Sequence, residues 1–119
     1  MKKIILDTNF SLIPFQFKVD IYEEFNRIIN EDYQLFFPRI ALPELLKLKF
    51  GSAGLKLMQK KDVEIIDIPL IENVDNSIIE YAKKENAIVA TQDKEIKRNS
   101  KKAGLKVITL RQKSYLDLM

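Results

Sequence analysis

The feature that most constrains the fold is a repeated alternation of short apolar runs with segments of helical hydrophobic spacing. The first run, Ile4 to Leu6, ends abruptly in Asp7, Thr8 and Asn9. Short runs rich in β-branched residues are typical of strands buried on both faces, as at the centre of a parallel sheet. The alternation therefore predicts an α/β fold, with helices on both faces of a parallel sheet. Four further strands are expected at residues 33–37, 63–68, 87–91 and 106–110.

Helical patterns fill most of the segments between these strands. Asp20 has the position of a helix N-cap, and Glu23 would complete a capping box in a helix that runs to about Asn30. Pro43 is tolerated only in the first turn of a helix, so the next helix is expected to begin near residues 40–42. The GSAG segment at 51–54 is expected to break that helix. The remaining expectations are a short connection at 11–20, a short helix at 55–61, helices at 74–85 and 93–104, and a short tail or helix at 111–119.

The composition excludes several classes of mechanism. The chain has 119 residues, of which 46% are apolar and 31% charged, and this predicts a single globular domain over residues 1–119. Without histidine or cysteine there is no Ser-His-Asp triad, no thiolate or imidazole zinc site and no disulfide. No apolar run is long enough to span a bilayer, and the N-terminus does not resemble a signal peptide. We therefore expect a cytoplasmic protein that does not bind membranes.

Basic residues are concentrated near the C-terminus. Residues 94–113 hold eight lysines and arginines but only one acid, Glu95, so the charge of this segment is +7. The net charge of the whole chain is only +3, so the rest of the chain is acidic. A basic segment of this kind suits a polyanionic partner such as nucleic acid. On charge alone, a solvated lysine-rich helix face is the simpler interpretation.

Four carboxylates lie where a strand leads into a helix, namely those of Asp7, Glu44, Asp75 and Asp93. Right-handed crossovers place all four at one edge of a parallel sheet. Asp75 and Asp93 are also good N-cap residues, and Asp7 suits an Asx-turn. Glu44 is expected to face the sheet, because Leu48 lies four residues further along the same helical face.

Carboxylates gathered at one edge need protons or a cation. Two of them about 5 Å apart repel by roughly 3 kcal/mol at an effective dielectric constant of 20. Oxygen ligands without histidine or cysteine select Mg²⁺ or Mn²⁺ over zinc. Such ions activate water and clamp the oxygens of an in-line phosphoryl displacement. An acidic metal site beside a basic flank suggests a nuclease.

Several segments resemble the PIN-domain family: LDTN at 6–9, PEL at 43–45, the block at 74–98 and VITLR at 107–111. The resemblance covers nearly the whole chain. Among PIN proteins, this chain most resembles the stand-alone prokaryotic ones, which include VapC-type toxins and relatives of the ribosomal small-subunit processing nuclease. It implies a three-layer α/β/α fold with five parallel strands in the order 3-2-1-4-5, and Mg²⁺- or Mn²⁺-dependent cleavage of single-stranded RNA. It also implies a homodimer and, for a toxin, an antitoxin partner.

The resemblance also assigns roles to individual residues. Asn9 and Thr91 match polar positions that support the acids by hydrogen bonding, and Gln92 stands where the family often has asparagine. The family's four acidic, metal-binding and catalytic positions are matched by Asp7, Glu44, Asp75 and Asp93.

These observations together predict a metal-dependent endoribonuclease. Phe15 or Phe17 is a candidate for stacking on an unpaired base, although core or dimer contacts are the simpler role for both. The main alternative is a PIN-like module that binds RNA or protein without cutting. A receiver-like phosphoacceptor domain also uses clustered acids, but it usually has paired acids after its first strand and this chain has one. The basic residues expected to contact the RNA backbone are Lys94, Lys97, Arg98 and Lys101.

Overall fold

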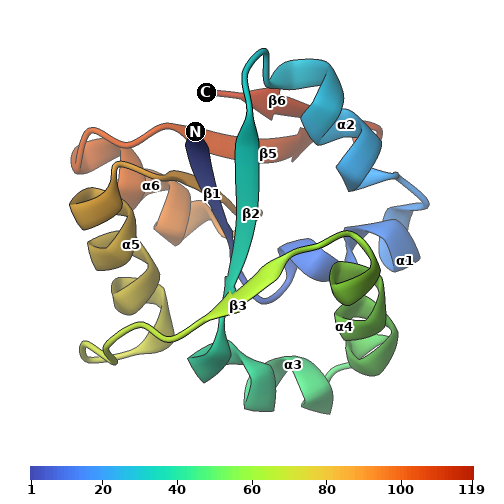
Figure 1. Cartoon of the computed structure of the whole chain (residues 1–119), viewed down its shortest axis with the longest axis horizontal. Coiled ribbons are helices and arrows are strands. Elements are labelled where there is room, and N and C mark those ends of the chain that lie inside the picture. The colour runs from blue at the N-terminus through green and yellow to red at the C-terminus, as the bar shows by residue number, and fades with distance from the viewer.

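The computed structural model describes residues 1–119 as a six-stranded sheet between two layers of helices (Figure 1). The strand order is β3-β2-β1-β4-β5-β6, with the first five strands parallel and β6 antiparallel to β5. The expected three-layer architecture and the 3-2-1-4-5 parallel core are therefore confirmed. The strands are β1 (Lys2–Leu6), β2 (Tyr33–Pro38), β3 (Glu64–Ile66), β4 (Ile88–Ala90), β5 (Val107–Arg111) and β6 (Tyr115–Leu118).

The helices are short, and the longest has 12 residues. No helix has both the length and the apolar character needed to cross a membrane. In chain order the α-helices are α1 (Ile13–Phe17), α2 (Ile21–Ile28), α3 (Leu42–Lys47), α4 (Gly51–Lys60), α5 (Val74–Glu85) and α6 (Lys94–Lys102). Two 3₁₀ turns, η1 (Phe10–Leu12) and η2 (Arg39–Ala41), precede α1 and α3.

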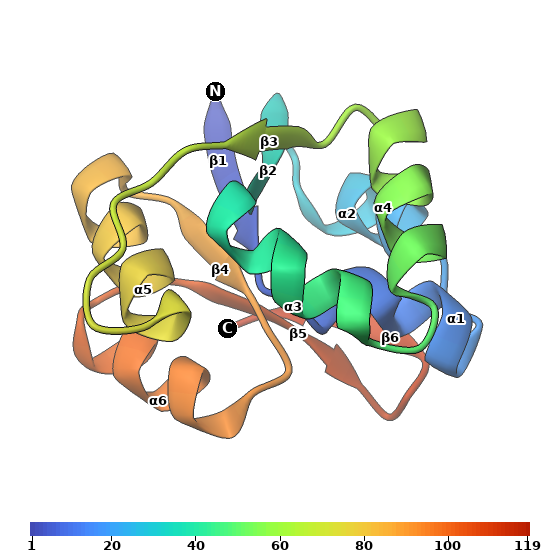
Figure 2. The ribbon, with the colours of Figure 1, turned by 90° about the horizontal axis from the view of Figure 1, so that it is seen from below.

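Strand β1 lies at the centre of the sheet and is buried on both faces, as its apolar run predicts. Ile4 and Leu6 pack into the larger core cluster, which η1, α1, α2, α3 and α4 cover. Ile5 points to the other face and packs beneath α5 and α6. Figure 2 looks at the carboxyl ends of the parallel strands, where α3 crosses the middle between α5 and α6 on one side and α1 and α4 on the other. This strand delivers the first acid, Asp7, to that edge.

Two expectations about the first half of the chain were wrong. The segment 11–20 was expected to be a connection, but most of it is helical, in η1 and α1. The GSAG segment does not break a helix, because it forms the first turns of α4. The break comes earlier, at Phe50, which has a left-handed backbone with φ 67°. Glycine is needed at position 51 for a close approach: a Cβ there would lie 1.9 Å from the carbonyl oxygen of Leu45.

The C-terminal segment also differs from the expectation, because it forms β6 rather than a tail or helix. The turn before it places Gln112 and Lys113 at positive φ, and it lacks the Asn-Gly or Asp-Gly pair that marks a hairpin in a sequence. Leu116 is 1% exposed and anchors the strand in the core. The backbone groups of Leu116 are bound by α2: its N–H donates to Glu24 Oε1 (2.9 Å), and its carbonyl accepts from Arg27 Nη2 (2.7 Å).

The contact at Gly51 gives a test of the turn between α3 and α4. We expect Gly51→Ala to lower the free energy of unfolding by about 2 kcal/mol or more, because backbone must move to admit the methyl group. Ser52→Ala, at the next and exposed position, is the matched control and should change stability little. Chemical denaturation of the three proteins measures the difference. Equal stability of Gly51→Ala and the wild type would contradict the geometry.

Candidate active site at the carboxyl edge of the sheet

Asp7 occupies the position directly after β1 and is only 5% exposed. Its Oδ1 accepts a hydrogen bond from the backbone N–H of Phe10 (3.0 Å), which is the local turn that a strand-end aspartate favours. Its Oδ2 accepts a hydrogen bond from the hydroxyl of Thr91, which follows the neighbouring strand β4. The carboxylate is therefore held from two sides within the protein.

Thr91 also connects Asp7 to Asp93. The Thr91 hydroxyl is fully buried and accepts a hydrogen bond from the backbone N–H of Asp93 (3.0 Å). Asp93 caps α6: its Oδ1 accepts from the N–H groups of Glu95 (2.8 Å) and Ile96 (3.0 Å). The N-cap interpretation of Asp93 is correct, and it leaves the second carboxylate oxygen without a partner in the protein. Capping and ligand binding are thus compatible at this residue.

Asp75 lies in the first turn of α5 but does not cap it. The cap is Asn73, whose side-chain oxygen accepts from the N–H of Asn76 (2.8 Å), so the N-cap interpretation of Asp75 was wrong. The Asp75 carboxylate makes no hydrogen bond within the protein. Residues at this place in a helix lie close to its positive dipole end, which favours a negative charge.

Glu44 follows Pro43 in the first turn of α3 and is exposed, so the expectation that it faces the sheet was wrong. The helix ends at Lys47, which leaves Leu48 outside it and 37% exposed. The residues that face the core are instead Ala41 and Leu45, which lie four positions apart. Leu45 rather than its neighbour Glu44 therefore points to the sheet. Glu44 therefore reaches the sheet edge from the solvent side.

The pKa values show that these acids share one electrostatic environment. Burial raises the pKa of Asp7 to about 6; the hydrogen bonds from Thr91 and Phe10 oppose this rise, and the charges of Asp75 and Asp93 add to it. The pKa of Asp75 is also raised, first by partial burial of its carboxyl and then by the charges of Asp93, Glu44 and Glu95. The charges of Asp75 and Asp93 thus act on Asp7, and those of Asp93 and Glu44 act on Asp75.

No basic side chain neutralises this group. The six ion pairs of the protein all involve other acids, although the chain has 20 lysines and arginines. Four unpaired carboxylates at one edge therefore form a site of concentrated negative charge.

The donor set fits a hard divalent cation, although the side chains are not gathered around one point. No three acids are arranged to hold an ion together. The carboxylates of Glu44 and Asp75 make no hydrogen bonds in the protein and belong to exposed residues. Oxygen ligands with uncompensated charge suit Mg²⁺ or Mn²⁺, and a cation would replace the proton that Asp7 takes up near pH 6.

Of the two predicted supporting residues, only Thr91 contacts an acid. The side chain of Asn9 is exposed and makes no hydrogen bond. Gln92 has a supporting role that the sequence did not reveal: its Oε1 accepts from the Thr109 hydroxyl (2.7 Å) and from the N–H of Leu110. These bonds tie the loop between Thr91 and Asp93 to β5. The only sign of this role in the sequence was that Gln92, an amide side chain, directly follows the strand predicted at 87–91.

The four predicted RNA-binding residues all lie on α6, but they differ in their surroundings. Lys97 is half-buried and donates to the Thr109 hydroxyl (3.2 Å), and Arg98 pairs with Glu95 (3.1 Å). Lys94 and Lys101 are exposed and have no ion-pair partner. Lys94 directly follows Asp93, whereas Lys101 is about two turns further along the helix.

The sequence matches the PIN-like domain family over residues 4–113. The chain is also 30% identical to "Ribonuclease VapC4" of Methanocaldococcus jannaschii, in an alignment that covers 99% of this chain and 97% of the relative. This chain belongs to the PIN-like domain family. The membership confirms the resemblance seen in the sequence.

Solved structures of PIN proteins have the same fold. The structure titled "PIN domain endonuclease Utp24" matches with a TM-score of 0.84 and 21% identity, covering 98% of this chain and 90% of its own. The VapBC2 structure from Rickettsia felis, bound to a DNA fragment from its promoter, matches with a TM-score of 0.65 and 21% identity. The match covers 92% of this chain and 99% of the VapBC2 chain. At these identities the matches show the fold alone.

The raised pKa of Asp7 predicts how the stability of this PIN-like chain depends on pH. Between about pH 4 and pH 6 the folded protein holds a proton on Asp7 that the unfolded chain has released, so stability falls as pH rises through this window. In metal-free buffer we expect the wild type to lose about 2–3 kcal/mol more than Asp7→Asn between pH 4 and neutral pH. Denaturant titrations across this range test it, and parallel pH profiles for the two proteins would show that Asp7 titrates normally.

Proposed function

We propose that this protein is a divalent-metal-dependent endonuclease that cleaves single-stranded RNA. The observation that carries the proposal is the coupled, unpaired group of Asp7, Glu44, Asp75 and Asp93 at the carboxyl edge of the sheet. This edge is where α/β folds place their chemistry. The similarity to the ribonuclease VapC4 and to the endonuclease Utp24 supports the same reaction class.

In this proposal Asp7, Asp75 and Asp93 hold Mg²⁺ or Mn²⁺, and Glu44 serves as a further ligand or as the base for the attacking water. When bound, the cation supplies Lewis acidity to the scissile phosphate and to the water. Thr91 keeps the Asp7 carboxylate and the Asp93 backbone in a constant relation through its two hydrogen bonds. The exposed position of Glu44 gives its carboxylate access to solvent, as proton transfer from water requires.

The RNA backbone would be bound by basic residues beside the acids. Lys94 adjoins Asp93 and is exposed, so it is best placed to contact a phosphate next to the cleaved one. Lys101, further along α6, would contact a more distant phosphate. Lys97 and Arg98 already have partners in the protein and would contribute mainly through their long-range charge.

The metal site is tested by replacing its acids. We expect Asp7→Asn and Asp75→Asn each to lower the rate of cleavage of a labelled single-stranded RNA with Mn²⁺ by roughly a hundredfold or more, since each 1.4 kcal/mol of lost transition-state stabilisation costs a factor of ten. Asp32→Asn is the matched control, because Asp32 is exposed at the start of β2, at the opposite edge of the sheet. Full activity in Asp7→Asn would remove this residue from the site.

Thermal melting supplies a second readout that does not depend on activity. A cation that binds only the folded state raises the melting temperature, so Mn²⁺ should stabilise the wild type at neutral pH and have less effect on Asp7→Asn. If millimolar Mn²⁺ shifts neither protein and no RNA is cut, the chain is better described as a PIN-like binding module.

The biological role proposed is that of a VapC-type toxin with a protein antitoxin as its partner, by analogy with the VapC relatives. A homodimer is proposed from the resemblance to the PIN-domain family alone. Induced expression in a bacterial host is expected to arrest growth for the wild type and not for Asp75→Asn, because arrest requires RNA cleavage. Asp32→Asn should arrest growth as the wild type does. Normal growth with a protein that is active in vitro would indicate a role in RNA processing instead.

A further inference from the structure

Phe50 presents a large aromatic ring at the corner between α3 and α4. It is a bulky residue with a left-handed backbone (φ 67°), which is uncommon and unfavourable, and yet its side chain is 42% exposed. Its ring stacks on that of Phe15 from α1, with centroids 5.8 Å apart and planes 16° from parallel. The close approach at Gly51 holds the corner that presents it. Two stacked aromatic rings are thus displayed at the surface.

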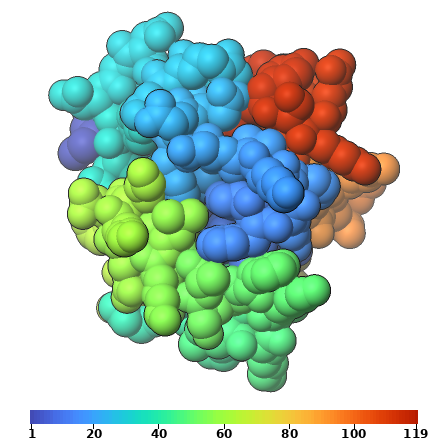
Figure 3. Space-filling model, turned by 90° about the vertical axis from the view of Figure 1, so that its right-hand side faces the viewer, coloured from blue at the N-terminus to red at the C-terminus, as the bar shows by residue number.

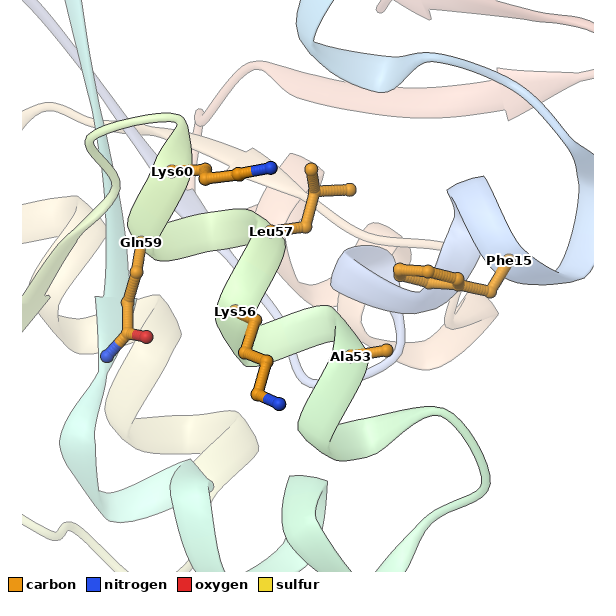
Figure 4. Close-up of a pocket in the computed structure, with 6 residues that line it drawn as sticks. All are labelled: Phe15, Ala53, Lys56, Leu57, Gln59 and Lys60. Carbon is orange, nitrogen blue, oxygen red and sulfur yellow. The ribbon is translucent and has the colours of Figure 1, made fainter.

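The surroundings of this pair are strongly basic. Residues 45–61 contain five lysines and no acid. The Nζ of Lys49 lies 5.2 Å from the centre of the Phe50 ring. Next to Phe15 an open recess of about 620 Å³ has Ala53 and Leu57 in its floor and the exposed Lys56 and Lys60 at its margin (Figure 4). Figure 3 shows α1, in blue, lying against the green surface of the α3–α4 segment on this side of the molecule.

The aromatic pair lies at the same end of the sheet as the acids. In Figure 2, which faces this end, α3 lies between the starts of α5 and α6 and the corner where α1 meets α4. Glu44 lies in the first turn of α3, and Phe50 follows the end of that helix, so this one short helix connects the two places. A chain that passes the acids along α3 would reach Phe50 next.

We propose that Phe15 and Phe50, with Lys49, Lys56 and Lys60, form a base-stacking platform that binds the single-stranded RNA beside the cleaved phosphate. This inference rests on the proposed ribonuclease function and extends its substrate site across α3. Successive bases would stack on the exposed face of the aromatic pair while the lysines contact phosphates, which is the usual combination for single-stranded nucleic acid. Because every base has a π-face, the platform would add affinity with little sequence preference.

Charge complementarity favours RNA over a protein at this surface. The platform carries only positive side chains, and its lysines are spaced along α4 as contacts to a polyanion would be. An apolar protein segment would leave these ammonium groups without partners. An acidic protein segment is the competing occupant; like polyphosphate it offers charge without bases, so the comparison of oligoadenylate with polyphosphate below distinguishes it from RNA.

The test measures binding without cleavage, so that it does not depend on the nuclease activity. Fluorescence anisotropy in EDTA follows the binding of a labelled oligoadenylate of about 12 nucleotides. We expect Phe50→Leu and Phe15→Leu each to weaken binding roughly tenfold, the size of one lost stacking contact. Tyr81→Leu, which removes a half-buried ring from α5 on the other face of the sheet, is the matched control and should leave affinity unchanged.

Inorganic polyphosphate, which has charge but no bases, distinguishes stacking from charge. Phe50→Leu should bind it as the wild type does, whereas Lys56→Gln should weaken both ligands and reduce the salt dependence of RNA binding by about 0.7 in the slope of log K against log salt. Thermal melts exclude unfolding as the cause, and Lys56→Gln alters no core contact.

Unchanged oligoadenylate affinity in both phenylalanine variants would overturn the platform. So would equal losses of affinity for oligoadenylate and polyphosphate in Phe50→Leu. The proposed function is judged separately, by Mn²⁺-dependent cleavage in the wild type. Normal cleavage with unchanged RNA binding would reject the platform alone, and retained stacking without any cleavage would reject the nuclease alone.

Discussion

The burial of one carboxylate without a counter-charge is the constraint on which the rest of the site depends. Asp7 is placed by the central strand, so its position cannot be relaxed without disturbing both faces of the core. Hydrogen bonds from Thr91 and Phe10 stabilise the ionised carboxylate, but they offset only part of the cost of burying it, so the pKa of Asp7 stays raised. The protein provides no lysine or arginine as the counter-charge. The remaining deficit is the electrostatic argument for the proposed cation at this place.

Charge is segregated over the surface in a way that suits two kinds of ligand. Acids occupy the middle of the carboxyl edge, whereas lysines dominate α6 on one side and the α3–α4 segment on the other. A polyanion approaching the acids alone would be repelled. A cation held between them reverses the sign of the local field, and the two basic flanks then act in the same direction. Binding of the metal and of the nucleic acid would therefore support each other.

Most of the fold could be predicted because its strands are short, apolar and separated by helical spacing. Asp7 and Asp93 were found by their places after such strands, and Thr91 by its match to the family motif. The errors came where tertiary contacts override local signals. Gly51 serves a close approach to Leu45 rather than a helix break, and β6 follows a turn without glycine or asparagine. The face of α3 was misjudged because a helix of six residues offers too little periodicity to set its phase.

The two hydrogen bonds that Leu116 receives from α2 have a consequence for how the molecule can associate. Strand β6 forms one border of the sheet, and an open border is a template on which another chain can add a strand. Glu24 and Arg27 occupy the outward backbone groups at the middle of β6, so an incoming strand would find no donor or acceptor there. Backbone pairing at this border, and the fibrous aggregation it permits, are thereby opposed.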